Sequence, residues 1–429
     1  MPGPVLVCAA TTRLAVAAHT AALTAGLLPA GPSWRTVLLA AEEPGPGIAA
    51  RFGTVLRWDD EFGPLRPDGW TPRVGDLPVL ERLLTDRWSL TGPLHLVVDG
   101  IAGLRSLAPI LSRARITVCV SDLASYGPTP VRLPVGVGSR ITSLLHLDLL
   151  PGASPVLLHE YDRQPVPIPL AALPALLGVP ADPPHGVLLL GESLTRRAAL
   201  PQAVEDRLTA TALRAALRAR PATPDPDPPP GDGDLVRGPR RRGHGPRVWF
   251  AGETVPRGLV REARRLGVPV HVVADPWSVR PALVVGHAGP ELAAYAALAR
   301  AGALPGTAVA ALGAGALAGG AERVAAVLVD RTVPRLTGGG RIVAPPPAAD
   351  LQESLRALAY TLRPGHLPEL REDALRHLAG PSAPRSRFPA AGLAALDLPV
   401  PSAGTRLRRV LSPGGRPRHG RPVADQPGP

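Results

Sequence analysis

Residues 94–120, LHLVVDGIAGLRSLAPILSRARITVCV, decide the fold of this 429-residue chain. Leu94–Val98 and Ile116–Val120 are almost continuous apolar runs, interrupted only by His95 and Thr117, which is typical of parallel strands that are buried on both faces. Between them, Leu104–Arg113 carries apolar residues at helical spacing. A strand, a helix and a second strand in so short a segment indicate a parallel βαβ unit.

The same alternation extends in both directions along the chain. It predicts an α/β protein with two Rossmann-like, doubly wound lobes and a cleft between them at the carboxyl ends of the strands. In the first lobe, further strands are predicted at Val5–Ala10, Trp34–Ala40 and Thr54–Trp58, and helices at Arg13–Thr24 and Pro78–Trp88. In the second lobe, strands are predicted at Gly186–Leu190, Arg247–Phe250, Val268–Val273, Pro281–Gly286 and Ala321–Asp330, and helices at Glu205–Arg220, Arg257–Leu266, Pro290–Arg300 and Asp350–Leu362.

The domain borders are predicted from changes in composition along the chain. We expect an N-terminal lobe over residues 1–180 and a C-terminal lobe over residues 181–375. Residues 221–246 are rich in Pro and Asp and then in Arg, and they cannot bury a face, so they are predicted to be a disordered insertion. Residues 376–429 are rich in Pro, Gly and Arg and are predicted to be a disordered basic tail.

The charge of the chain suggests one macromolecular contact and argues against another. All 47 basic residues are Arg, the net charge is +12, and residues 380–429 carry half of that excess. A basic tail can contact an anionic membrane surface, although a solvated tail without a partner is the simpler interpretation. No segment interleaves basic with aromatic side chains as a stacking platform for bases would, so nucleic-acid binding is not expected.

The cysteines and the apolar segments bear on the compartment. Cys8 and Cys119 lie inside apolar runs and are predicted to be buried hydrophobic residues, which suits a reducing cytoplasm. The N-terminus lacks the features of a secretory signal. Residues 301–320 are mostly Ala and Gly and are interpreted as loops and small-residue packing rather than a membrane span. A cytoplasmic protein is expected, with contact at the inner membrane face through the tail as an option.

Loops that follow the predicted strands of the first lobe hold its candidate functional groups. Asp99-Gly100 follows one strand and is interpreted as a turn. Ser121-Asp122 follows the next, with Ser125 and Tyr126 close behind. For Asp122 two interpretations stay open, a cap for the turn after its strand and a functional carboxylate.

In the second lobe, two loops contain candidates. Glu253 and Thr254 follow Arg247–Phe250 and are interpreted as caps of the next helix. Gly286-His287-Ala288-Gly289 precedes a helix whose amino end could bind an anion. The chain has no glycine-rich nucleotide loop, no nucleophile elbow and no zinc spacing, so neither a metal nor a bound cofactor is expected.

Several stretches in fixed order resemble the actinobacterial branch of the bacterial α-2,8-polysialyltransferase family. The clearest are residues 51–58 (RFGTVLRW), 67–73 (PDGWTPR), 125–129 (SYGPT) and 144–152 (LLHLDLLPG), with weaker similarity at 187–191 and 280–286. The resemblance covers roughly Val5 to Leu336. It implies a GT-B-like fold and transfer of sialic acid from CMP-sialic acid to a glycan acceptor, with inversion and without a metal.

The resemblance also assigns roles to residues. The family's Asp-Gly motif falls on Asp122, the general base, although Leu123 replaces the Gly, and Ser125 and Tyr126 fall on the substrate side. Its His-Pro motif, which contacts the CMP phosphate, falls on residues 251–254, where Glu253 and Thr254 stand instead. Its Gly-Ser motif at a helix start keeps Gly286, with His287 and Gly289 in place of the Ser.

Three hypotheses follow. The first is a divergent glycosyltransferase with Asp122 as general base and a nucleotide sugar in the second lobe. The second is a degenerate family member that binds or regulates without catalysis, because the His-Pro and Ser motifs are not retained. The third is a protein that acts at the anionic inner membrane face through its basic tail.

Overall fold

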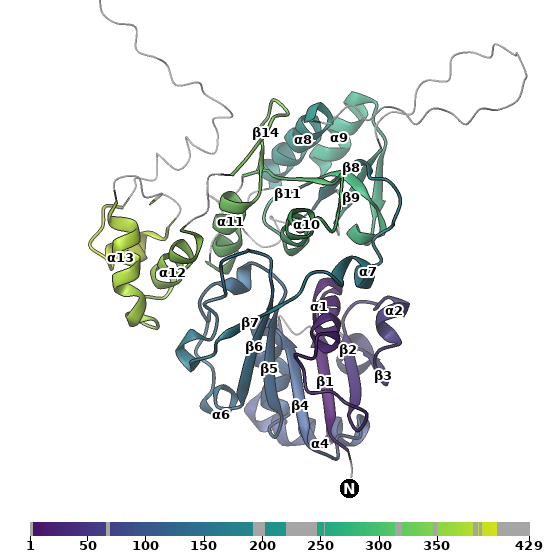
Figure 1. Ribbon diagram of the computed structural model, residues 1–429, viewed down its shortest axis with the longest axis vertical. Helices are drawn as coiled ribbons and strands as arrows, with labels where there is room; N and C mark the ends of the chain where they lie inside the picture. The colour runs from purple at the N-terminus through teal and green to yellow at the C-terminus, as the bar shows by residue number, and fades with distance from the viewer. Residues whose placement is uncertain are drawn as a thin grey trace, which may run out of the picture.

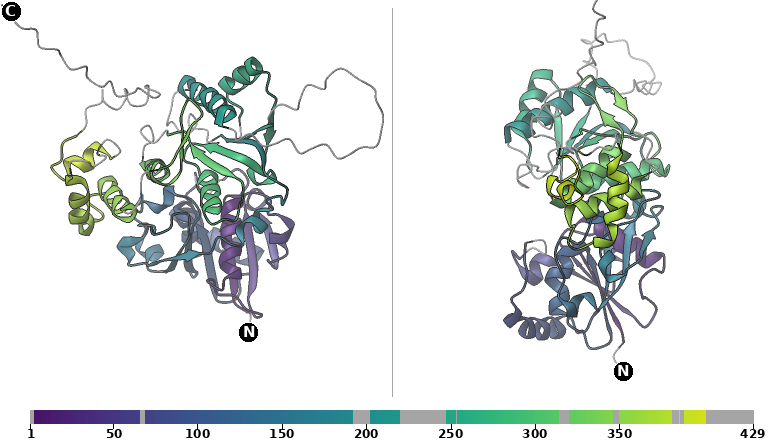
Figure 2. Two further views of the ribbon diagram at one scale, coloured as in Figure 1. Left: turned by 45° about the horizontal axis from the view of Figure 1, so that its top comes forward. Right: turned by 90° about the vertical axis from the view of Figure 1, so that its left-hand side faces the viewer.

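The computed structural model describes residues 3–65, 69–191, 202–219, 247–252, 254–313, 320–345, 350–380, 385 and 388–400. These residues form two α/β lobes stacked along the long axis, with a group of C-terminal helices beside them (Figures 1 and 2). The predicted insertion at residues 221–246 lies outside the described residues.

The N-terminal lobe is built on a parallel sheet in the Rossmann order β3-β2-β1-β4-β5-β6-β7. The central strands β1, β4 and β5 are almost entirely buried, as their apolar sequences predict. The sheet consists of β1 (Val5–Ala10), β2 (Arg35–Ala40), β3 (Thr54–Arg57), β4 (Leu94–Asp99), β5 (Arg115–Val120), β6 (Ile141–Leu147) and β7 (Pro165–Ile168). Its helices are α1 (Arg13–Thr24), α2 (Pro46–Ala49), α3 (Trp58–Phe62), α4 (Leu77–Arg87), α5 (Gly100–Ile110), α6 (Val135–Gly138) and α7 (Leu173–Leu177).

The C-terminal lobe repeats this topology, with the order β10-β9-β8-β11-β12-β13-β14 and an antiparallel last strand. Two Rossmann-like lobes in tandem form the predicted GT-B-like fold. The second sheet consists of β8 (His185–Leu190), β9 (Val248–Ala251), β10 (Val270–Val273), β11 (Pro281–Gly286), β12 (Ala308–Ala311), β13 (Arg335–Leu336) and β14 (Ile342–Val343). Its helices are α8 (Gln202–Ala219), α9 (Arg257–Leu266), α10 (Pro290–Arg300) and α11 (Gly320–Thr332).

Two predictions in this lobe are wrong. Residues 321–330, expected to be a strand, lie in helix α11, whose residues 324–329 are all buried. A short apolar run that is buried on all sides suits a helix as well as a strand, and periodicity cannot separate them. Residues 308–311, expected to lie among loops, form β12 because they pair with β11 in spite of their weak strand propensity.

The predicted start of the disordered tail is also wrong. Residues 376–379 belong to α13 (Arg371–Ala379), and α14 (Ala390–Ala394) packs against α12 (Leu351–Leu362). Phe388, Leu393 and Leu396 are buried. These few apolar residues anchor a Pro-rich and Arg-rich segment to the helical core. Residues 401–429 lie outside the described residues.

The two lobes are joined by contacts from several elements. Arg13, at the start of α1, forms an ion pair with Asp275 of the C-terminal lobe and donates a hydrogen bond to the Leu177 carbonyl oxygen (2.8 Å). Arg300 of α10 donates to the Leu149 carbonyl oxygen (2.5 Å). Such fixed contacts hold the carboxyl ends of the first sheet against the second lobe.

Helix α12 contacts both lobes. Its Gln352 accepts a hydrogen bond from the Ser154 amide of the N-terminal lobe (2.7 Å), while Asp350, at its N-terminus, pairs with Arg331 of α11. In Figures 1 and 2 the yellow-green helices α12 and α13 lie beside the junction of the lobes. Contacts from the C-terminal helices therefore help to hold the two lobes together.

Both cysteines are buried and free, as predicted. None of the described helices combines the length and the apolar character that crossing a membrane requires.

Candidate functional site

The loops after three neighbouring strands of the first sheet meet at the side chain of Asp99. Asp99 is the last residue of β4. Thr11, which follows β1, donates its hydroxyl to Asp99 Oδ2 (2.7 Å), and Ser121, which follows β5, donates to Oδ1 (3.0 Å). Because β1 and β5 flank β4, a single carboxyl group collects the polar residues of all three strand ends.

The environment of Asp99 favours its protonated form. Burial and, next, the negative charge of Asp122 raise the pKa of Asp99 to about 6, although the hydrogen bonds from Thr11 and Ser121 oppose the shift. A carboxyl group with this pKa can hold or release a proton close to neutral pH.

Gly100 allows Asp99 to occupy this position. The chain enters α5 directly after β4, and Gly100 makes the bend with a φ of +57°, which favours glycine. A Cβ atom at Gly100 would also lie 3.3 Å from Ser125 Oγ. The Asp-Gly pair, interpreted from the sequence as a turn, is therefore a strand-to-helix corner next to the Ser125 hydroxyl.

Asp122 organises the segment that follows β5. Its Oδ1 accepts the Ser125 amide (2.8 Å) and its Oδ2 accepts the Ser125 hydroxyl (3.0 Å). Both oxygens thus stabilise the short helix η2 (Ala124–Tyr126), as the capping interpretation predicts. The negative charge of Asp122 also acts on Asp99.

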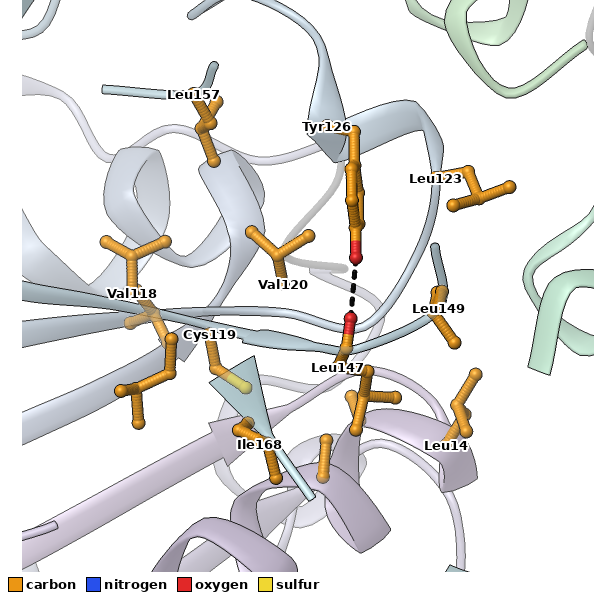
Figure 3. Close-up of a cluster of buried hydrophobic side chains, with 14 of the residues drawn as sticks. Leu14, Val118, Cys119, Val120, Leu123, Tyr126, Leu147, Leu149, Leu157 and Ile168 are labelled. Atoms are coloured by element: carbon orange, nitrogen blue, oxygen red, sulfur yellow. Dashed lines mark hydrogen bonds between the residues drawn. The ribbon is translucent and has the colours of Figure 1, made fainter. Parts of the chain in front are cut away.

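Tyr126 has a structural position. Its side chain is fully buried, and its hydroxyl donates to the Leu147 carbonyl oxygen (2.6 Å) and contacts His146 Nδ1 (3.1 Å). Figure 3 shows this hydroxyl directed into the apolar cluster around Val120 and Leu147. The assignment of Tyr126 as a substrate-binding residue is therefore wrong, because the fold already uses its polar atom.

Gly127 is a contact point between the lobes. Helix α11 packs on η2, and a Cβ atom at Gly127 would lie 2.7 Å from Val324 Cγ2. The Ser125-to-Pro128 run therefore forms a surface on which the second lobe docks.

The loop after β9 differs from its prediction. Thr254 is exposed, and Pro256, rather than Thr254, precedes the first turn of α9 and makes no side-chain cap. Glu253 lies outside the described residues. The interpretation of Thr254 as a helix cap is wrong, since Pro256 already sets the extended backbone that starts the helix.

The loop after β11 leads into the amino end of α10. β11 ends at Gly286, His287 is buried, and Gly289 precedes the first helical residue, Pro290. The N-cap residue, Gly289, has no side chain with which to cap the helix. Backbone amides in the first turn of a helix of this length attract anions. The candidates Gly286, His287 and Gly289 thus share one loop, whereas Thr254 lies two strands away, beyond β8.

The described residues therefore bring Asp99, Ser121, Asp122 and Ser125 together in the first lobe. The helix start at Gly289 is a separate candidate in the second lobe. The described part of the chain holds no group of three or more His, Cys, Asp or Glu residues suited to a metal ion. Sequence reasoning underrated Asp99. The sequence did contain a signal for Asp99. An Asp-Gly pair comes directly after one predicted buried strand, and Ser121-Asp122 comes directly after the next predicted strand.

No protein-family model matches the chain, and no curated protein matches it. Some solved structures resemble this chain, at low sequence identity. A Listeria monocytogenes protein provisionally assigned as a UDP-N-acetylglucosamine 2-epimerase shares 13% identity over 93% of this chain and 99% of its own, with a TM-score of 0.44. MurG from Acinetobacter baumannii shares 12% over 92% and 99%, with a TM-score of 0.36.

A Photobacterium 2,6-sialyltransferase, solved with CMP and lactose, shares 9% identity over 68% of this chain and 69% of its own, with a TM-score of 0.37. At such identities and scores, these neighbours carry no information about the chemistry of this chain. Any function must therefore be argued from its own residues.

Proposed function

We propose that this chain is a glycosyltransferase that transfers a sugar from a nucleotide donor to a glycan acceptor, with inversion and without a metal. The observation that carries the proposal is the Asp99 carboxyl at the carboxyl end of β4, where hydroxyl groups from two neighbouring strand ends donate to its two oxygens. Burial and the charge of Asp122 raise the pKa of this carboxyl to about 6. An acceptor hydroxyl is a weak nucleophile until a base takes its proton, and a base is most effective when its pKa is near the working pH.

Within this proposal, Asp99 is the general base and Asp122 is the charged neighbour that raises its pKa. Asp122 remains the alternative base, since the family resemblance assigns that role to it. One feature favours Asp99. Of the two carboxylates, Asp99 accepts hydrogen bonds from hydroxyl groups at two different strand ends, whereas Asp122 accepts both of its hydrogen bonds from Ser125 in its own segment. Ser125, beside Gly100, is the proposed contact to the acceptor.

The donor belongs to the second lobe in this proposal. The amino end of α10, with Gly286, His287 and Gly289, would bind the phosphate of the nucleotide through backbone amides. Thr254 and Glu253, in the loop after β9, would contact the rest of the nucleotide. The family resemblance names CMP-sialic acid as the donor, and a polysialyltransferase-like activity is the most specific form of the proposal.

A second candidate is a family member that binds without catalysis. The observation in its favour is the loop after β9, where Ala251-Gly252-Glu253-Thr254 stands in place of the family's His-Pro pair. Loss of a donor to the leaving phosphate would remove a main source of rate acceleration and leave binding possible.

Nucleotide titration by thermal shift and calorimetry tests both candidates. CMP, CMP-sialic acid, UDP-glucose and GDP-mannose are compared, and a ligand at 100 times its Kd should stabilise the fold by about 2.7 kcal/mol. Stabilisation by none of them would refute the glycosyltransferase proposal. Stabilisation by UDP or GDP sugars alone would change the donor.

Turnover then separates the roles. If the proposal is right, Asp99→Asn abolishes transfer and leaves nucleotide binding intact, while Asp122→Asn lowers transfer only partly. The pH profile of kcat/KM in the wild type should rise through pH 6 as Asp99 loses its proton. Binding without transfer by the wild type would support the second candidate, and full transfer by Asp99→Asn would exclude Asp99 as the base.

A further inference from the structure

Helix α9 and the edge strand β10 line an open apolar pocket on the surface of the C-terminal lobe. Its volume is about 530 Å³, and its walls include Val255, Leu259, Val260 and Val272. Among the described residues that line it, Arg264 alone is charged. A volume in the range of roughly 300–1,000 Å³, apolar walls and one charged group are usual for a small-molecule site.

The pocket opens onto exposed apolar surface. Val272 of β10 is 59% exposed and Leu266, at the end of α9, is 36% exposed. β10 is the outermost strand of its sheet, so no neighbouring strand of that sheet covers this side. Exposed apolar groups beside an apolar pocket indicate a surface that meets an apolar partner.

Arginines border this apolar surface. Arg257, Arg261 and Arg264 are exposed and follow one another at helical spacing on α9, and none of them forms an ion pair with a described residue. The single acidic residue of the helix, Glu262, is buried and already paired with Arg214 (3.2 Å) and Arg265 (2.6 Å). Arg264 in the pocket lining, and Arg257 and Arg261 on the same helix, are therefore positive charges that no described acidic residue neutralises in an ion pair.

An exposed apolar stripe on α4 lacks this charge. Val79 and Leu83 of α4 are 70% and 55% exposed, but Glu81, Arg82 and Asp86 carry both signs of charge on the same helix. Apolar exposure with a positive border thus distinguishes the α9–β10 surface from the α4 stripe.

The location of the surface suits a docking role. In Figures 1 and 2, α9 lies at the end of the C-terminal lobe that points away from the N-terminal lobe. Asp99 and Ser121 lie at the opposite side, on the edge of the first sheet. A partner on α9 and β10 would leave those residues accessible.

We propose that the α9–β10 pocket is a site for an anionic membrane lipid, with an acyl chain between Val260 and Val272 and the phosphate of the headgroup against Arg261 and Arg264. The apolar walls bind the chain through the hydrophobic effect, and the arginines bind the phosphate through charge-assisted hydrogen bonds. The site therefore holds the chain at an anionic bilayer surface. It is independent of the proposed transfer reaction and of the C-terminal tail.

The test is co-sedimentation of the full-length chain with vesicles of phosphatidylcholine alone or mixed with phosphatidylglycerol. The wild type should pellet with the mixed vesicles and lose binding as salt is raised. Since each arginine near an anionic surface contributes about 1 kcal/mol, Arg261→Glu/Arg264→Glu should weaken binding at least tenfold. Val272→Asp should weaken it by about tenfold as well, because a charge replaces an inserted apolar group.

Matched controls change the same groups elsewhere. Arg113→Glu/Arg132→Glu alters two exposed arginines of the N-terminal lobe by the same total charge, and Val79→Asp adds the same acid to the α4 stripe. Both should bind nearly as the wild type does. The proposal is overturned if the two charge reversals weaken binding equally, if Val272→Asp binds normally, or if the wild type does not pellet.

A soluble polyanion completes the design. Polyglutamate is added at increasing concentration to the wild type and to Arg261→Glu/Arg264→Glu, first without vesicles and then together with the mixed vesicles. Binding that requires these arginines, together with no pelleting by vesicles, would show that the surface takes an acidic peptide and would overturn the lipid proposal. Pelleting that polyglutamate cannot fully displace supports insertion of an acyl chain.

Discussion

Gly127 and Val324 lie in different lobes, and a Cβ atom on Gly127 would approach Val324 Cγ2 to 2.7 Å. Gly127 follows η2 at the carboxyl edge of the first sheet, and Val324 is a fully buried residue of α11. The φ of Gly127 is −72°, which any residue can adopt. A glycine is therefore needed here because Val324 leaves no room for a side chain, and not because of the backbone conformation. The close approach of the two lobes at this point depends on the absence of a side chain at Gly127.

The first prediction concerns this contact. Gly127→Ala should lower the free energy of unfolding by about 1–3 kcal/mol, because the added methyl group overpacks the junction. Adding Val324→Ala should restore part of the loss, since it removes the atoms that clash. Urea unfolding of the two single variants and the double variant measures the coupling.

Gly136→Ala is the matched control, as no atom lies within 4 Å of a Cβ atom there. It should leave stability nearly unchanged. Strictly additive effects of Gly127→Ala and Val324→Ala would mean that the two residues do not meet in solution.

The second prediction contrasts two carboxylates. Folding holds a proton on Asp99 up to about pH 6, whereas an aspartate ordinarily has a pKa of 3.8. The folded state therefore binds more protons in this window, and its stability falls as pH rises through it. Asp99→Asn removes that cost. At pH 7.5 it should therefore be more stable than the wild type by about 1–2 kcal/mol, less than the full linkage because one acceptor is lost.

Asp122→Asn should act in the opposite direction. It loses the hydrogen bond from the Ser125 hydroxyl and weakens the start of η2, so stability should fall by about 1 kcal/mol. Guanidinium unfolding at pH 7.5 and at pH 4 checks both variants. If Asp99→Asn is less stable than the wild type at pH 7.5, the buried Asp99 carboxylate does not destabilise the folded state as proposed.

Much of the fold follows from the sequence because parallel strands buried on both faces are apolar throughout. Leu94–Val98 and Ile116–Val120 were predicted to within one residue of β4 and β5. The same rule failed at residues 321–330, since a run buried on every side carries no periodicity. A different rule, the prediction of disorder from composition, failed near Phe388, where three apolar side chains in a polar segment suffice to dock a helix.

The candidate site was less predictable. Asp122 was visible as a carboxylate after a strand, but its use of both oxygens on Ser125 depends on the backbone of η2. Asp99 was interpreted as a turn because its partners, Thr11 and Ser121, are far apart in sequence and meet only through strand order. Tyr126 was misassigned because the sequence does not show which way a ring points.

The third prediction concerns His19, which is fully buried in α1 with no hydrogen-bond partner for either ring nitrogen among the described residues. Burial lowers its pKa to about 4. The unfolded chain takes up the proton below about pH 6.5 and the folded chain only below about 4, so this residue makes stability fall as pH drops through that window.

His19→Leu should flatten this dependence. Between pH 7.5 and pH 5, the wild type should lose about 2 kcal/mol more than the variant does. His95 has a pKa lowered to about 4 by burial and by Arg115, but its ring bonds Thr117 (2.8 Å). His95→Leu should therefore flatten the dependence while costing stability at pH 7.5. Identical pH profiles for the wild type and His19→Leu would show that His19 is solvated.

The last prediction tests the docking of α14. A Cβ atom at Gly392 would lie 2.2 Å from the Thr361 carbonyl oxygen, so α14 touches the backbone of α12. Gly392→Ala should force the two helices apart and expose Phe388, which is 1% accessible. We expect a loss of about 2–4 kcal/mol for Phe388→Ala, a similar direction for Gly392→Ala, and little effect of Gly365→Ala, where a Cβ atom meets nothing within 4 Å.

Limited proteolysis gives the local readout. If α14 is docked, the wild type resists cleavage between α13 and residue 400, and Gly392→Ala is cut there faster while both lobes stay intact. Helix α12 also contacts both lobes, because Gln352 accepts a hydrogen bond from Ser154 and Asp350 pairs with Arg331. Undocking of α14 should therefore weaken these contacts between α12 and the lobes. Equal cleavage rates in the wild type and Gly392→Ala would mean that α14 contributes nothing to these contacts.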